Sequence, residues 1–118
     1  MEYDRITWAM DNALQILYNN DGTINGYVIV ATTTSYSGHG EGGLDVYLIR
    51  TDANGNELWS KTFGGTANDY GRSVQPTSDG GFIIAGVTNS FGVLSSDVYA
   101  IKTDSNGNLE WEATYNLT

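Results

Sequence analysis

The sequence contains no cysteine, one histidine, one proline and only five basic residues among its 118. Without cysteine, disulfide bonds, thiolate catalysis and cysteine-ligated zinc or iron–sulfur sites are excluded. The single histidine, His39, excludes a histidine-rich metal centre. The 14 acidic residues give a net charge of −9, which repels phosphate backbones, so we expect no nucleic-acid partner. No apolar run approaches the ~18 residues that a membrane span needs, so we expect no membrane span.

Glycine, by contrast, is abundant. The 15 glycines, together with many Asn, Thr and Ser residues, indicate tight turns and therefore β-structure. Hydrophobic residues make up 40% of the chain, enough to form the core of one ordinary domain and to argue against general disorder. The composition predicts an acidic, turn-rich β domain.

The strongest signal is an internal repeat. Residues 45–59 (DVYLIRTDANGNELW) and 97–111 (DVYAIKTDSNGNLEW) are identical at ten of 15 positions. Upstream, 26–36 (GYVIVATTTSY) aligns with 81–91 (GFIIAGVTNSF). A period of roughly 50 residues is typical of propeller or solenoid repeats. We therefore interpret 1–118 as a single repeat domain, with an extra strand at 2–10, blade 1 at 11–63 and blade 2 at 64–118.

Each copy contains four strand-like runs separated by turn residues. The predicted strands are 13–19, 26–35, 44–52 and 57–63 in the first copy, and 71–77, 81–89, 97–104 and 108–115 in the second. Middle strands such as Val46-Tyr47-Leu48-Ile49 are apolar on both alternating faces, which indicates sheets covered on both sides. The predicted fold class is all-β, with two four-stranded antiparallel propeller-like blades. A solenoid of stacked β units is the alternative.

The repeats also resemble known propeller blades. TDANGNELW (51–59) and TDSNGNLEW (103–111) resemble the Asp–Gly–Trp hairpin of quinoprotein-type blades. With a shifted spacing, they also resemble the Asp-box hairpin of sialidase-like propellers. The segment 63–92 closely resembles tandem blades of large secreted bacterial and archaeal surface proteins. The resemblance implies an extracellular or cell-surface module. The cofactor and catalytic residues of quinoprotein dehydrogenases and sialidases have no counterparts here, so we expect no cofactor.

The D-x-N-G-N segments invite a calcium interpretation, because alternating oxygen side chains can converge on a hard cation. The six candidate ligands are Asp52, Asn54, Asn56, Asp104, Asn106 and Asn108. At the twelfth position, however, where a calcium loop has a bidentate glutamate, the two copies have Phe63 and Tyr115. We therefore predict hairpin turns, in which Asp accepts backbone N–H bonds and Asn-Gly tolerates positive φ, and no metal site.

Carboxylates for glycoside hydrolysis could be drawn from Asp69, Asp79, Glu110 and Glu112. Each falls at a predicted turn or on an outer strand, where solvated charge belongs, so we predict no catalytic residue. Trp59 and Trp111 occupy the same repeat position and are expected to pack between blades.

Ligand-binding candidates are expected on the loops between the second and third strands and on the loop that joins the blades. These two sets of loops share a face in propellers. The candidates are Tyr36, His39, Asp69 and Phe91. Tyr36 and Phe91 are matched repeat positions, so packing between blades is the alternative role for both.

The leading functional hypothesis is a non-enzymatic structural or interaction module. Two blades cannot close a ring, since propellers have ~4–8 blades, so we expect self-association head-to-tail into a ring of three or four chains, or a filament. The alternative is a carbohydrate-binding, lectin-like propeller with a glycan or protein partner, and a glycoside hydrolase or lyase is a distant third.

Overall fold

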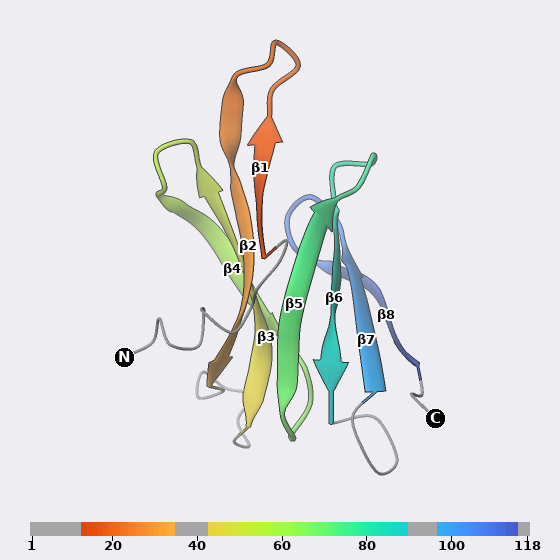
Figure 1. Ribbon diagram of the computed structural model, residues 1–118. Coiled ribbons are helices and arrows are strands. Elements are labelled where there is room, and N and C mark those ends of the chain that lie inside the picture. Colours follow the sequence, from red (N-terminus) through yellow and green to blue (C-terminus); the bar gives the residue numbers. More distant parts are fainter. Residues whose placement is uncertain (1–12, 35–42, 90–96, 116–118) are drawn as a thin grey trace.

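The computed structural model describes residues 13–34, 43–89 and 97–115, and within these residues all regular structure is β-strand (Figure 1). The strands are β1 (Leu14–Tyr18), β2 (Ile24–Thr34), β3 (Leu44–Asp52), β4 (Glu57–Phe63), β5 (Asp69–Pro76), β6 (Phe82–Thr88), β7 (Asp97–Thr103) and β8 (Leu109–Tyr115). The bounds of β3 and β4 are those predicted from the sequence. The expected strand at 2–10 lies outside the described residues.

The eight strands form two four-stranded antiparallel sheets, as predicted. The first sheet has the order β1-β2-β3-β4 and the second the order β5-β6-β7-β8, so each sheet is a meander of adjacent hairpins. The repeat extends to irregularities of pairing: the register of β3 with β4 shifts between Arg50 and Thr51, and that of β7 with β8 shifts between Lys102 and Thr103. In the described part of the chain, no helix is long and apolar enough to cross a membrane.

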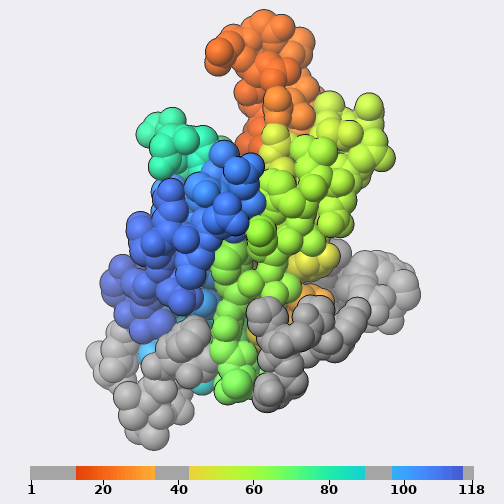
Figure 2. Space-filling view, turned by 180° about the vertical axis from the view of Figure 1, so that it is seen from behind, coloured from red at the N-terminus to blue at the C-terminus, as the bar shows by residue number. Residues whose placement is uncertain are grey.

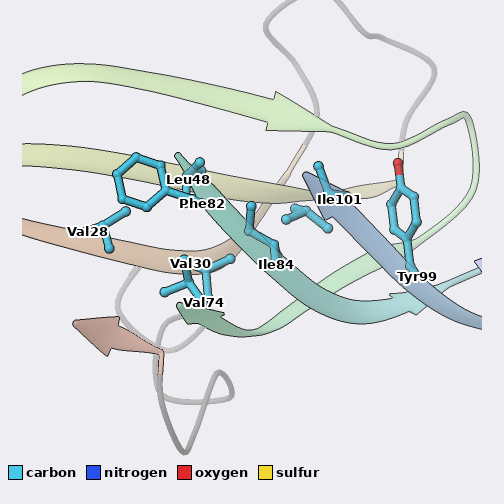
Figure 3. Close-up of a cluster of buried hydrophobic side chains, with 9 residues drawn as sticks. Val28, Val30, Leu48, Val74, Phe82, Ile84, Tyr99 and Ile101 are labelled. Atoms are coloured by element: carbon cyan, nitrogen blue, oxygen red, sulfur yellow. The ribbon is translucent and has the colours of Figure 1, made fainter. Parts of the chain in front are cut away.

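The two sheets pack face against face, and their side chains form one core (Figure 3). The first sheet contributes Val28, Val30, Val46 and Leu48, and the second contributes Val74, Phe82, Ile84, Tyr99 and Ile101. Successive side chains of a strand point to opposite faces of the sheet, which determines the residues that enter the core. Val28 and Val30 are fully buried, whereas Ile29 between them is only half-buried. Apolar residues on one face of each sheet therefore hold the molecule together.

The residues that face the core in the first sheet do not correspond, in the repeat, to those that face the core in the second. Leu48 of the first sheet lies in the core, but its counterpart Ala100 lies on the other face of the second sheet. Conversely, Ile101 is buried in the core, whereas its counterpart Ile49 points away from it. The sheets are thus stacked in the same sense, one face of the first against the opposite face of the second.

The strand β5 runs across the first sheet at close range (Figure 1). A Cβ at Gly71 would lie 2.7 Å from Cγ2 of Val30 and 2.8 Å from the carbonyl oxygen of Ala31. The Gly71 N–H donates to the Thr32 hydroxyl at 3.1 Å, across the interface between the two sheets, which we call the internal joint. The strand therefore packs so closely against the first sheet that position 71 requires glycine.

Adjacent isoleucines test which face carries the stability. We expect Ile84→Ala to lower the free energy of unfolding by about 2–5 kcal/mol, because the side chain is fully buried and its removal leaves a cavity. Ile83→Ala, on the opposite face, should cost no more than about 1 kcal/mol. Urea unfolding at concentrations where the chain is monomeric measures both, and equal losses would contradict the assignment of faces.

Candidate functional site

Two hairpin turns at matching positions of the repeat carry the D-x-N-G-N motif. In the first, Oδ1 of Asp52 accepts the N–H groups of Asn54 and Asn56, each at 2.9 Å. In the second, Oδ1 of Asp104 accepts those of Asn106 and Asn108, also at 2.9 Å. Both glycines of these turns have positive φ, 88° and 82°. The hairpin turns predicted from the sequence are confirmed.

The second carboxylate oxygen in each turn is also occupied. Oδ2 of Asp52 accepts the Asn56 side-chain amide at 3.1 Å, and Oδ2 of Asp104 accepts that of Asn108 at 3.3 Å. Hydrogen bonds from Asn56 lower the pKa of Asp52, and those from Asn108 lower the pKa of Asp104. Each carboxylate is surrounded by N–H donors, and a cation would have to displace them. Among the described residues, no group of three or more acidic or histidine side chains is arranged to hold a metal ion.

Asp69 is not a solvated residue, and this part of the sequence interpretation was wrong. It begins β5 and is fully buried between the sheets. Its carboxylate accepts hydrogen bonds from the Thr88 hydroxyl and from the N–H of Gly65, the latter at 3.0 Å. It therefore anchors the connection between the two sheets. The other three ligand-binding candidates, Tyr36, His39 and Phe91, lie outside the described residues.

The remaining candidate carboxylates join polar contacts at the edge of the second sheet. Lys102 Nζ lies 3.1 Å from Asp79 Oδ2 and 3.0 Å from Glu110 Oε1. Hydrogen bonds from Thr77, Gly81 and Lys102 lower the pKa of Asp79. A general acid for glycoside hydrolysis needs a raised pKa, so this carboxylate is tuned in the opposite direction.

The fourth carboxylate, Glu112, accepts the buried hydroxyl of Tyr99 at 2.5 Å. Burial, followed by this hydrogen bond, raises the pKa of Tyr99, and the charges of Asp69 and Asp45 raise it further. The phenol therefore stays protonated and donates from the core to the edge strand β8. This hydrogen bond connects β7 to the edge strand β8.

The two repeat tryptophans differ in their surroundings. Trp59 is half-buried, and its ring lies 6.1 Å from that of Phe82 at an interplanar angle of 59°. It also covers the second hairpin turn, since a Cβ at Gly107 would lie 2.5 Å from its Cζ3. Figure 2 shows β4 (yellow-green) beside the strands of the second sheet (blue). Trp111 is 47% exposed. Packing between the sheets is confirmed for Trp59 and wrong for Trp111 within one chain.

A groove of about 450 Å³ opens between the turn ends of the two sheets. Its lining includes Tyr18, Asn25, Arg50, Pro76, Phe82 and Ser105. Tyr18 is 62% exposed, and the Arg50 guanidinium donates to Asn25 Oδ1 and to the Thr51 carbonyl. Burial lowers the pKa of Arg50. The sequence interpretation missed this groove, because its lining comes from segments far apart in the chain.

The outer faces of the two sheets also carry apolar side chains, several of which are exposed. On the first sheet the outer face carries Leu14, Ile16, Tyr27, Ile29, Tyr47 and Ile49; on the second it carries Ile83, Ala85, Val98, Ala100, Trp111 and Tyr115. Leu14 is 51% exposed and Tyr115 is 54% exposed. Apolar patches of this kind usually mark interaction surfaces.

Comparison with known proteins adds no family assignment: no protein-family model matches the chain, and no curated protein matches it significantly.

The hairpin turns lead to a calcium prediction. Because both oxygens of Asp52 and of Asp104 already accept N–H groups, calcium should not stabilise the fold. Melting curves recorded with millimolar calcium and with chelator should coincide. An increase of several degrees in Tm with calcium, lost in Asp104→Asn, would show that these turns bind the metal.

Proposed function

We propose that the chain is a non-enzymatic structural or interaction module of an extracellular or cell-surface protein, which associates head-to-tail through its open sheet faces. One observation carries this proposal: the joint inside the chain pairs two different faces of the repeat. Each face that is buried between the sheets has its counterpart on the outer face of the other sheet: Leu48 corresponds to the half-buried Ala100, and Ile101 to the half-buried Ile49. A second chain can therefore add to either end by the same kind of contact.

The driving force is removal of apolar surface from water. A lone chain leaves Leu14 and Ile16 exposed at one end, and Val98 and Tyr115 at the other. Monomers rarely keep such patches open, and stacking covers both at once. The net charge of −9 on each chain opposes association. Association should therefore become stronger as added salt screens the repulsion between chains.

Contact between unlike faces produces a closed ring or an open filament. If each stacked sheet acts as a propeller blade, three chains supply six blades and four supply eight, within the usual ~4–8. A rotation that does not divide the circle gives a filament. The extracellular or cell-surface location is supported by the resemblance of 63–92 to blades of secreted surface proteins.

The mass in solution tests the proposal. At micromolar concentration and moderate salt, light scattering coupled to size exclusion should give three or four times the 12.8 kDa of one chain, or a concentration-dependent filament. Val98→Lys should reduce the mass to that of one chain, because it places a charge in the contact between chains. Asn20→Lys, which makes the same charge change in an exposed turn, should assemble normally. A parent chain that stays monomeric would contradict the proposal.

A second candidate function, glycan binding, is favoured by the groove between the turn ends. Sugars bind where an exposed aromatic ring adjoins amide and hydroxyl groups. Tyr18, Asn25 and Ser105 supply these groups around the groove of about 450 Å³.

A glycan array would reveal this second function. A binding signal should be lost in Tyr18→Ala, which removes the ring at the groove, and kept in Leu58→Ala, which removes an exposed apolar side chain that does not line the groove. A signal that survives Tyr18→Ala would place the site outside the groove. A blank array would count against glycan binding.

A further inference from the structure

We infer that chains join in the register of the internal joint, with Trp111 of one copy seated on the Gly55 turn and the Tyr27 ring of the next copy. The inference rests on the proposed head-to-tail association and adds the residues that define the contact and its direction. The partner is a second copy of this chain.

The internal joint provides the template. Trp59, on the edge strand β4 of the first sheet, packs against Phe82 and over the Gly107 turn of the second sheet. Beside this contact, Lys61 Nζ donates to Asn108 Oδ1 of the same turn at 3.4 Å. One edge strand and one hairpin turn thus fix how the two sheets align.

The same parts recur on the outer faces of the two sheets, at the matching positions of the repeat. In the repeat, Trp111 corresponds to Trp59, Tyr27 to Phe82 and Gly55 to Gly107. Trp111 is 47% exposed and lies on the open face of β8, paired with Lys102 of β7. Among the described residues outside 54–56, no heavy atom would lie within 4 Å of a Cβ at Gly55, whereas Gly107 is covered by an indole.

The open turn has the geometry that already receives an indole. Asp52 bonds Asn54 and Asn56 at the same 2.9 Å distances as the corresponding bonds in the second turn. The glycine N–H in each turn donates to the aspartate carbonyl at 3.1 Å. The surface that receives Trp59 is therefore preformed at the opposite end of the molecule, and Trp111 is the side chain that matches it.

The direction of association follows from these positions. Trp111 lies on the open face of the second sheet, whereas Tyr27 lies on the open face of the first. A head-to-head contact would place Trp111 against another Trp111 and leave the Gly55 turn uncovered. Only the head-to-tail contact pairs the indole with the turn.

Cysteine crosslinking tests this register, because the natural chain has no cysteine. The contact between Lys61 and Asn108 has Ala113 and Asn56 as its counterparts between chains. We would prepare Ala113→Cys and Asn56→Cys as separate single variants, mix them, and treat the mixture with a short bismaleimide. The single-chain double variant Lys61→Cys/Asn108→Cys is the positive control, since it should react internally with the same reagent.

The expected result is a crosslinked dimer that forms at least tenfold faster in the mixture than in either variant alone. Adding Trp111→Ala to Ala113→Cys should reduce this rate at least tenfold, and Trp111→Phe should restore part of it. If each single variant alone formed crosslinked dimers as fast as the mixture, while the assembled mass stayed the same, the proposed register would be wrong. The chains would then associate head-to-tail through other contacts, or head-to-head. A parental mass of one chain would overturn both proposals.

Fluorescence gives an independent measurement without cysteine. In Trp8→Phe/Trp59→Phe, Trp111 is the remaining indole. Its emission should shift to shorter wavelength as the concentration rises through the association range, because the ring leaves water. An emission maximum that is the same in the monomeric and assembled samples would overturn the seating of Trp111.

Discussion

Everything in this molecule depends on the fact that the middle strands are apolar on both faces. In Val46-Tyr47-Leu48-Ile49, the first and third residues enter the core, and the second and fourth face outward. A sheet with one solvated face would need only the first set. Since both sets are apolar in both copies, each sheet presents an apolar surface on both sides. The packing of the two sheets covers only one of these surfaces on each sheet.

The joint between the sheets is directional because polar groups and glycines, not only apolar area, determine its alignment. Asp69 holds Thr88 and the Gly65 N–H at one end of the joint, and Gly71 admits the close approach of β5 to Val30. At the other end, Trp59 covers the Gly107 turn. Apolar faces alone could slide over one another, whereas these contacts define one register.

The sequence predicted the strands closely because each copy alternates clear turn chemistry with apolar runs, and two copies provide independent readings of one unit. The turns at Asp52 and Asp104 were predictable for the same reason, since Asx bonding is local. Long-range placement was less accessible. The burial of Asp69 depends on Thr88 and Gly65 meeting it across the fold, and the groove at Arg50 depends on both sheets. The exposure of Trp111 could not follow from the repeat, because the repeat makes it equal to Trp59.

The contact between chains should be weaker than the joint within a chain, for a reason visible in the side chains. Val30 and Leu48 fill the internal joint, whereas their counterparts on the open face are Ala85 and Ala100. Each missing buried methylene costs about 0.8 kcal/mol of apolar burial. The opposing face loses no such volume, since Ile84 and Ile101 have isoleucines as counterparts. We therefore expect the pair of sheets to fold as one unit, and the proposed association of chains to be a separate, concentration-dependent step.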